Sequence, residues 1–435
     1  MEADQNRPGP LAGVVVLDLS RVLAGPWATQ LLGDLGAEVI KIERPGAGDD
    51  TRQWGPPFAT NADGSRGDAA YFFCANRNKK SVAVDIATPE GAQIVRDLAA
   101  QADVLVENFK VGGLKKYDLD FESVRQANPK LVYCSITGFG QTGPNAGRAG
   151  YDYMIQAMAG LMSITGETDG EPMKVGVAVA DLSAGLYASN AILAALLHAR
   201  ASGKGQHIDI ALFDVQAAML ANQATNWFVS GEVPRRLGNA HPNLVPYQPF
   251  PTADGNVVIA VGNDGQFRAL CTVLGASGLA SDQHFAGNAL RVEHRAELVG
   301  RLSTLTAAWP SADLFAALEG AGVPCGPINT IDQVFAEPQA AARELVIEQP
   351  RSGDAAPVRT VASPIRLSRT PVGSGLPPPR LGADTLEVLQ RRLGLAASEL
   401  ETLQTSGAIE GPGLGGAGTH AASRGPVTTG NGGPI

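Results

Sequence analysis

Asp181 is the residue of this sequence whose surroundings best suit covalent chemistry. It follows a continuous run of apolar residues and glycines, 175–180, and precedes a helical pattern that is apolar on nearly every side. A carboxylate there can cap a helix that starts at Leu182, by accepting a backbone N–H bond. It can also act as a nucleophile, because helix donors keep it ionised while apolar walls exclude water. From composition and spacing alone, the cap is the favoured interpretation.

The other reactive side chains do not form a recognised catalytic set. The six histidines include no HExxH pair, and the four cysteines lie far apart with no CxxC spacing. We therefore predict no metal site and no disulfide framework, which fits a reducing cytoplasm. Ser183 lacks the first glycine of a nucleophile elbow, since Asp181 stands in its place,.

Length and charge limit the class of protein. A chain of 435 residues with 44% hydrophobic and 18% charged residues predicts two folded units,. Its 43 acidic and 34 basic residues argue against a nucleic-acid partner,. The N-terminus has no apolar signal segment, and the apolar stretch 182–197 is interrupted by serine and asparagine. We expect that stretch to be a buried helix, and we expect no membrane partner.

The elements that must position Asp181 follow an α/β pattern. Strands are predicted at 13–18, 38–43, 81–85, 103–107 and 131–136, where apolar and β-branched residues run with little polar alternation. Such runs are typical of a parallel sheet that is covered on both faces. Between two of them, Thr88-Pro89-Glu90 combines a capping side chain, a first-turn proline and an early acid, which predicts the start of a helix,.

The pattern changes after this region and predicts a second domain. We expect the first part of a large domain over 1–225, a small domain over 240–325 and a return to the large domain over 330–405. The small domain opens with a hairpin signal at Asp254-Gly255, where glycine is expected to supply a positive φ,. The segment 323–327 is predicted to be a connection, and the Gly-rich tail 407–435 is predicted to be disordered,.

Several motifs, in order and in register, resemble class III CoA-transferases of the CaiB/BaiF type. The matching segments are Pro10–Ser20, Ala24–Pro26, Leu31–Glu43, Arg44–Asp49, Asn78–Ser81, Val106–Phe109, Gly138–Pro144 and Gly150–Asp152. The resemblance extends from about residue 10 to residue 405. It implies a Rossmann-like large domain with a parallel sheet, a smaller α+β domain and an interlocked homodimer.

The resemblance also implies roles for individual residues. Asp181 would attack an acyl-CoA thioester to form a mixed anhydride, and the released CoA would then form an aspartyl thioester. Coenzyme A is thus implied as co-substrate, with Arg44, Lys110 and Lys116 as the cations for its phosphates. Each of these cations, taken alone, is more often a solvated surface charge. The implied CoA-binding set is Val22, Leu23, Ala24, Arg44, Val84, Asn108, Phe109, Lys110, Lys116, Arg148, Tyr151 and Asp152. A substrate loop is implied at Gly262, Asn263, Gly265 and Gln266, with an ordinary strand-to-helix turn as the alternative.

Three functions remain open at this point. Segments 241–247, 262–263 and 323–329 resemble members that transfer CoA from succinyl-CoA to short dicarboxylates. Arg148 could meet either a second carboxylate or a CoA phosphate. The sister α-methylacyl-CoA racemases have a histidine where this chain has Tyr151, and an unperturbed phenol is a poor general base at neutral pH. Transfer is therefore favoured over racemisation. A non-catalytic acyl-CoA-binding protein is the third alternative.

Overall fold

The computed structural model describes residues 9–351, 356–373 and 375–412, and the chain divides into two compact units. The first comprises Met1–Leu161, Gly176–Ala221 and Ala341–Ile435, and the second comprises Met162–Val175 and Asn222–Ala340. These bounds differ from the predicted ones at 330–340, which belongs to the second unit and not to the large domain, and at 162–175. That segment joins the second unit because the Arg236 side chain donates hydrogen bonds to the carbonyls of Glu167 and Gly170. Local hydropathy carries no sign of such a long-range pairing.

A seven-stranded sheet forms the centre of the first unit, and six of its strands are parallel. Its order is β14 (Ile409–Glu410), β5 (Lys79–Val84), β2 (Glu38–Glu43), β1 (Val15–Asp18), β6 (Val104–Glu107), β7 (Val132–Thr137) and β8 (His207–Ala211). The five predicted strands are confirmed, each within two residues of its expected bounds. The chain starts in the middle at β1, moves outward through β2 and β5, and crosses back to β6.

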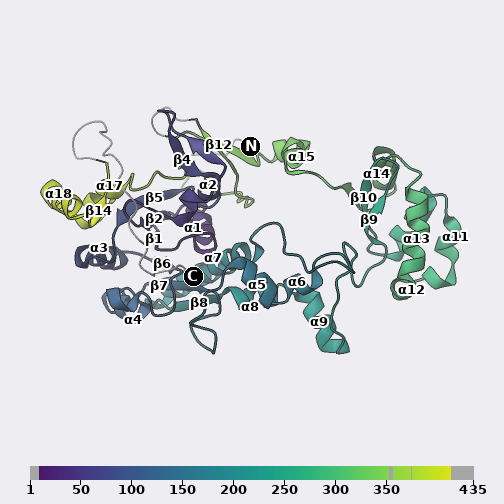
Figure 1. Ribbon diagram of the computed structural model, residues 1–435, viewed down its shortest axis with the longest axis horizontal. Coiled ribbons are helices and arrows are strands. Elements are labelled where there is room, and N and C mark those ends of the chain that lie inside the picture. Colours follow the sequence, from purple (N-terminus) through teal and green to yellow (C-terminus); the bar gives the residue numbers. More distant parts are fainter. Residues whose placement is uncertain (1–8, 352–355, 374, 413–435) are drawn as a thin grey trace. The chain divides into compact units, whose positions relative to one another are not determined.

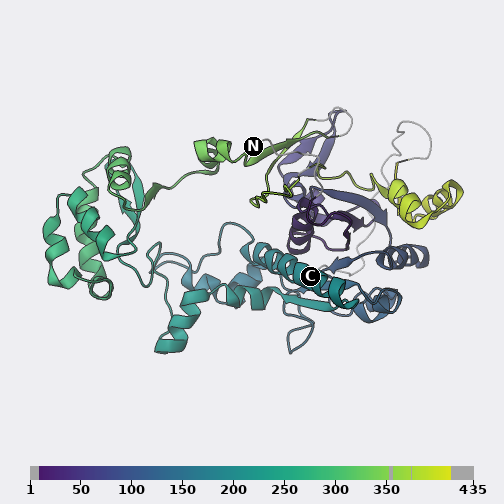
Figure 2. The same ribbon diagram turned by 180° about the vertical axis from the view of Figure 1, so that it is seen from behind.

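Helices cover both faces of this sheet (Figures 1 and 2). Val16 of β1 packs towards one layer and Leu17 towards the other, as the two-residue period of a strand requires,. The first layer contains α1 (Ala24–Asp34), α5 (Asp152–Met158), α7 (Val179–Ser202) and α8 (Leu212–Ala218). The second contains α3 (Pro89–Ala99), α4 (Phe121–Ala127), α17 (Thr385–Leu393) and α18 (Ala397–Ser406). The mixed α/β class with a parallel-dominated sheet is thereby confirmed, and so is the predicted start of α3, where the Thr88 side chain accepts from the Gly91 N–H.

Helix α7 is the long apolar helix of this unit. By length and composition alone, α7 is apolar enough to span a membrane. Half of its most apolar stretch is buried inside the protein, as in a core helix. It packs closely on α1 at Gly185, where an added Cβ would lie 2.8 Å from the carbonyl oxygen of Ala24. Glycine is therefore required for this close approach, which brings the first turn of α1 against the second turn of α7.

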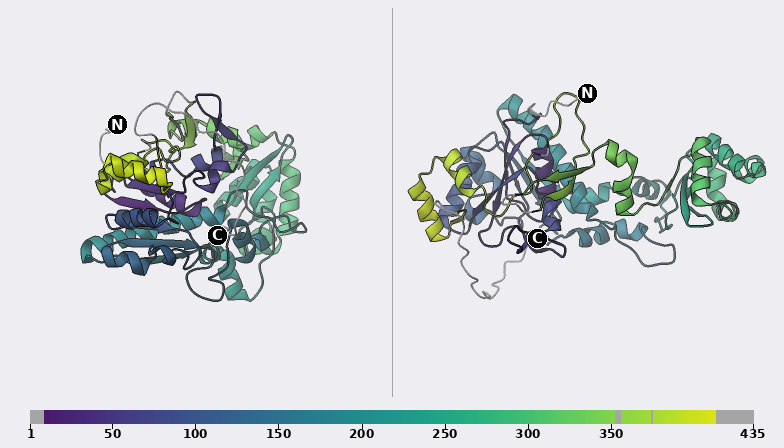
Figure 3. Two further views of the ribbon diagram at one scale, coloured as in Figure 1. Left: turned by 60° about the vertical axis from the view of Figure 1, so that its left-hand side comes forward. Right: turned by 90° about the horizontal axis from the view of Figure 1, so that it is seen from above.

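The second unit is built on an antiparallel sheet of β9 (Tyr247–Pro251), β10 (Asn256–Ala260) and β11 (Cys325–Pro327). Its helices, drawn in green in Figure 3, enclose a separate core; they are α10 (Asp264–Val273), α11 (Ser277–Ser281), α12 (Asn288–Glu293), α13 (Arg295–Thr306) and α14 (Ser311–Gly320). The predicted hairpin is present, but Gly255 does not have a positive φ. Instead, Asp254 fixes the turn by accepting from the N–H and hydroxyl of Ser311. The segment 323–327 was wrongly expected to be only a connection, since its last three residues form the edge strand β11.

The remaining elements are short. They are β3 (Phe58–Thr60), β4 (Arg66–Ala69), α2 (Ala70–Phe73), α6 (Leu161–Ile164), α9 (Ala221–Ser230), α15 (Ile331–Ala336), α16 (Pro338–Ala342), β12 (Val346–Gln349) and β13 (Val358–Val361). The predicted disordered tail begins too early, because Ile409–Glu410 pairs with β5 as β14 and Gly407 ends α18 in a left-handed conformation. The prediction for 413–435 lies outside the described residues.

Candidate active site

A pocket containing Asp181 lies where the central strands end. Its lining comes from the last residues of β7, from the segments that follow β1, β6, β7 and β8, and from the first turn of α7: Arg21, Val22, Leu23, Ala24, Asn108, Ile136, Thr137, Gly138, Gly150, Tyr151, Asp181 and Leu212. The chain runs outward in opposite directions from β1 and β6, so the loops that follow these two strands separate. Open α/β sheets bind ligands at this kind of switch point, outside the carboxyl ends of the strands. We call this hollow the Asp181 pocket.

Asp181 is not the cap of α7. The helix begins at Val179, two residues before Asp181, and its own preceding residue supplies no side-chain cap. The cap comes from Asp152, the first residue of α5, whose Oδ1 accepts hydrogen bonds from the N–H groups of Ala180 (2.8 Å) and Asp181 (3.3 Å). The favoured interpretation of Asp181 from its local sequence was therefore wrong, because a residue 29 positions earlier performs the capping.

The Asp181 carboxyl is consequently left for another role. Burial raises its pKa to about 7, and the nearby Asp152 carboxylate adds to the increase. The side chain is surrounded by protein but still part-exposed to solvent, as expected for a group at the base of a pocket. Near neutral pH the carboxyl is thus available as an anion, and its weak hydration favours nucleophilic attack.

Two glycines bring Tyr151 to this pocket. A Cβ added to Gly138 would lie 2.6 Å from the Cα of Gly150, so the segment after β7 and the segment before α5 touch through their backbones. Tyr151 follows directly and lines the Asp181 pocket, while Asp152 starts α5. The Gly150–Asp152 motif therefore places both side chains beside the first turn of α7.

A second hollow adjoins the first and shares Arg21 with it. We call it the Lys116 pocket. Its lining includes four cations, several apolar and aromatic side chains and three carboxylates: Arg21, Arg44, Lys110 and Lys116; Leu19, Ile42, Val84, Ile86, Phe109 and Tyr117; and Glu43, Asp49 and Asp85. Cations beside aliphatic and aromatic surfaces suit a ligand that combines phosphates with a flat ring. Arg148 lies in a smaller hollow with Phe109 and Lys110, where its guanidinium stacks over the Phe139 ring at 5.3 Å.

The predicted CoA-binding residues therefore gather in one region of the first unit. Val22, Leu23, Ala24, Asn108 and Tyr151 line the Asp181 pocket, Asp152 contacts its helix, and the remaining predicted residues line the two adjoining hollows.

The predicted substrate loop belongs to the second unit. There, the Asn263 side chain caps α10 by accepting from the Gln266 N–H, and the Gln266 Oε1 accepts from the Gly262 N–H. Gly265 lies in the first turn of that helix. These contacts are those of a strand-to-helix turn, and a substrate role for the loop stays a prediction.

Tyr71 is a residue near Asp181 that sequence reasoning missed. Burial raises the pKa of its phenol to about 12, and the charge of Asp181 contributes to the increase. Its ring meets Trp54 edge-on at 5.3 Å. Tyr71 stands outside every motif quoted above, so no sequence signal was available for it. Arg21, by contrast, stands between two matching motifs and could have been included.

Among residues 9–351, 356–373 and 375–412, no group of three or more His, Cys, Asp or Glu side chains is placed to hold a metal ion.

Comparisons with known proteins agree on one family. The model of "CoA-transferase family III" matches residues 11–385. The succinate–glutarate CoA-transferase of Agrobacterium fabrum is 54% identical over 399 residues, which cover 92% of this chain and 98% of that protein. The succinyl-CoA:glutarate CoA-transferase of Mus musculus is 46% identical, over 94% of this chain and 92% of that protein. A crystal structure of a CaiB/BaiF family protein from Brucella suis aligns with a TM-score of 0.79 and 51% identity, over 89% of this chain and 100% of that one.

Proposed function

The chain belongs to CoA-transferase family III, and from this membership we propose that it moves CoA from succinyl-CoA to a small dicarboxylate such as glutarate. The observation that supports this most is the Asp181 carboxyl. Asp152 caps α7, so the Asp181 carboxyl is not used as a cap. The carboxyl is desolvated at the base of the Asp181 pocket, which adjoins the Lys116 pocket and its cations.

Asp181 is the proposed nucleophile. Its carboxylate attacks the thioester carbonyl of succinyl-CoA, the C–S bond breaks, and a mixed anhydride and the CoA thiolate result. The thiolate attacks the carbonyl carbon of Asp181, succinate leaves with the bridging oxygen, and Asp181 becomes a CoA thioester. The acceptor carboxylate then repeats these steps in reverse. Each acyl bond stays activated, so the sequence is freely reversible.

Arg44, Lys110 and Lys116 are proposed to bind the phosphates of CoA, because they surround a hollow that also offers Val84 and Phe109 to an adenine ring or pantetheine chain. Arg148, with its guanidinium on Phe139, is proposed to bind either a CoA phosphate or the second carboxylate of the substrate. The excess of negative charge on the whole chain makes such local cations important for an anionic ligand,.

Trapping tests the proposal directly. The enzyme is incubated with succinyl-CoA without acceptor, quenched with hydroxylamine or borohydride, and digested. We expect modification of the peptide that contains Asp181, together with ping-pong kinetics when glutarate is varied. Asp181→Asn is the matched control and should give neither modification nor product. An unmodified Asp181 in a preparation that transfers CoA would contradict the proposal.

The two alternatives give different results in the same preparation. An isomerase would bring deuterium from heavy water into the α-carbon of an acyl-CoA without any acceptor acid. A non-catalytic binding protein would bind CoA and leave succinyl-CoA and glutarate unchanged, with or without Asp181.

We also propose a cytoplasmic homodimer, in which the two chains interlock. Apolar side chains that stay exposed in a single chain support association: Leu197 of α7 is 71% exposed and Phe228 of α9 is 73% exposed,. Sedimentation should give twice the monomer mass. Interlocked chains should also fail to exchange subunits with a differently tagged sample unless both are first unfolded, whereas rapid exchange would contradict interlocking.

A further inference from the structure

The turn between β1 and α1 forms one wall of the Asp181 pocket and contains a strained residue. Val22 has a φ of 72°. A β-branched side chain in this left-handed region is unfavourable and persists only where the surroundings impose it. Because Val22 and its neighbours line the pocket, whatever imposes this conformation also sets the shape of the site.

Side chains hold the backbone just before Val22. The Asn108 side chain, which follows β6, accepts from the Arg21 N–H at 2.9 Å and donates to the Arg21 carbonyl at 2.7 Å. The buried Lys41 ammonium of β2 donates to the Ser20 carbonyl at 2.9 Å. Lys41 of β2 and Asn108, just after β6, therefore hold the backbone groups of Ser20 and Arg21 directly before Val22.

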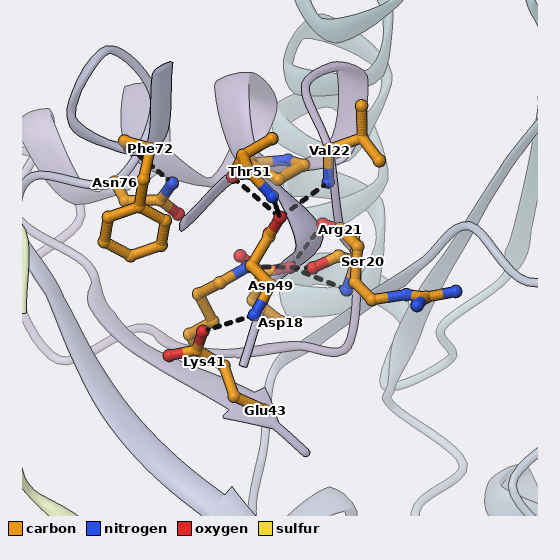
Figure 4. A network of polar contacts seen from close by, with 12 residues as sticks. Asp18, Ser20, Arg21, Val22, Lys41, Glu43, Asp49, Thr51, Phe72 and Asn76 are labelled. Atoms are coloured by element: carbon orange, nitrogen blue, oxygen red, sulfur yellow. Dashed lines mark hydrogen bonds and ion pairs between the residues drawn. The ribbon is translucent and has the colours of Figure 1, made fainter. Parts of the chain in front are cut away.

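Asp49 holds Val22 itself. Its Oδ1 accepts from the Val22 N–H at 3.2 Å and from the N–H and hydroxyl of Thr51, while its Oδ2 accepts from Lys41 at 2.9 Å (Figure 4). The side chains of Asp49 and Lys41 are wholly buried. Burial would raise the pKa of Asp49, but the Lys41 ammonium and the hydrogen bonds from Thr51 together outweigh it and lower the pKa to about 2. The acceptor for Val22 is therefore a permanent anion, which makes a stronger hydrogen bond than a neutral one.

The same buried cluster reaches the first turn of α1. Asp18, at the end of β1, accepts from Ser20 and Thr29 and pairs with Lys79 at 3.1 Å. Lys79 also donates to the carbonyl of Pro26 in α1 at 2.9 Å. The Asp18–Lys79 ion pair therefore links the end of β1 to the first turn of α1, and the two charges of the pair compensate each other.

We infer that Asp49, held in place by Lys41, is a positioning residue for the reaction at Asp181, because it fixes the left-handed Val22 and thereby the wall of the pocket that faces the nucleophile. This inference rests on the proposed function. It differs from a purely structural role of the ion pair, in which loss of Asp49 would lower stability and leave the folded fraction fully active.

A double-mutant cycle tests the inference, since glycine adopts a positive φ without strain. Asp49→Ala removes the anion, Asp49→Asn keeps a neutral acceptor, and Val22→Gly removes the need for restraint. Asp68→Asn is the matched control, because Asp68 pairs at 2.8 Å with Arg52 and makes no hydrogen bond to the turn. Turnover of succinyl-CoA with glutarate, CoA affinity by calorimetry and urea stability are measured for each.

We expect Asp49→Ala to lower kcat/KM about 10- to 100-fold per folded enzyme, as for loss of a charge-assisted hydrogen bond, and Asp49→Asn to lower it less. Val22→Gly in the Asp49→Ala background should recover at least about fivefold, while Asp68→Asn stays within about twofold of wild type. The inference would be overturned if the effects of Asp49→Ala and Val22→Gly on kcat/KM were additive, or if the unfolded fraction alone explained the loss. If Asp49→Ala does not fold, Asp49→Asn with and without Val22→Gly gives the same comparison. A wild type that binds CoA but transfers none would instead contradict the proposed function.

Discussion

Replacement of Asp181 by asparagine should abolish transfer and stabilise the fold above neutral pH. The pKa of Asp181 is raised from 3.8 to about 7 in the folded chain, so the unfolded chain ionises first as the pH rises. Between pH 4 and pH 7, roughly the interval between these two pKa values, the folded state binds more protons, and stability is lost with rising pH. Above pH 7 the loss is complete, and asparagine, which does not titrate, avoids it.

The magnitude follows from the size of the shift. About three pKa units correspond to roughly 4 kcal/mol, at 1.36 kcal/mol per unit. Asp181 is part-exposed, and solvent screening reduces this figure, so we expect a gain of about 1–2 kcal/mol at pH 8 and almost none at pH 4.5. Stability that is sacrificed for a reactive carboxylate is a recurring property of enzyme sites.

The assay is urea unfolding of the wild type and of Asp181→Asn at several pH values, with protein concentration held constant because of the proposed dimer. Other titrating groups are common to both proteins, so the difference in stability isolates Asp181. A difference that does not change with pH, or a less stable asparagine variant at pH 8, would refute the reasoning. Such a result would mean that the pKa of Asp181 is not raised in the folded chain.

Three further predictions follow from the same geometry. In a pH–rate profile, the rate of transfer at low succinyl-CoA concentration should rise with pH, with a midpoint near the pKa of Asp181, about 7, and then level off,. Asp152→Asn removes a neighbouring negative charge and should move this midpoint to lower pH. Lys116→Ala should raise KM for succinyl-CoA about tenfold with little change in kcat, and steady-state kinetics showing an equal fall in kcat would argue against a phosphate contact,. Gly138→Ala should destabilise the fold by about 2 kcal/mol, because the new Cβ meets the backbone of Gly150, and urea unfolding measures this against Gly147→Ala, where the space is open,.

Much of the fold could be predicted because it depends on local patterns. Apolar runs predicted five strands of the seven-stranded sheet, and the signals around Thr88 predicted the start of α3. Two strands of the sheet were missed. The edge strand β8, His207–Ala211, is only partly buried and alternates polar and apolar residues, so it lacks the continuous apolar run of the others. The two-residue strand Ile409–Glu410 forms only because the edge of β5 is available. The assignment of 162–175 to the second unit has the same origin in distant contacts.

The candidate site was only partly accessible to sequence reasoning. The position of Asp181 beside an apolar helix was visible, but its freedom from capping was not, because the donors of α7 are satisfied by Asp152 from another helix. The part of Asp49 in fixing Val22 was hidden for a similar reason: a positive φ at a valine contradicts its propensity and is imposed by tertiary contacts,.

The most direct test of acylation at Asp181 traces ¹⁸O from the acceptor carboxylate. If the acceptor carboxylate attacks the Asp181 thioester and CoA then attacks the acceptor carbonyl, the bridging oxygen remains with Asp181. Transfer from succinyl-CoA to glutarate labelled with ¹⁸O in its carboxylates should therefore replace an oxygen of Asp181 by ¹⁸O, and mass spectrometry of the peptide that contains Asp181 should show it after a few turnovers. Formation of glutaryl-CoA with no label in that peptide would contradict the central claim that Asp181 is acylated in the reaction.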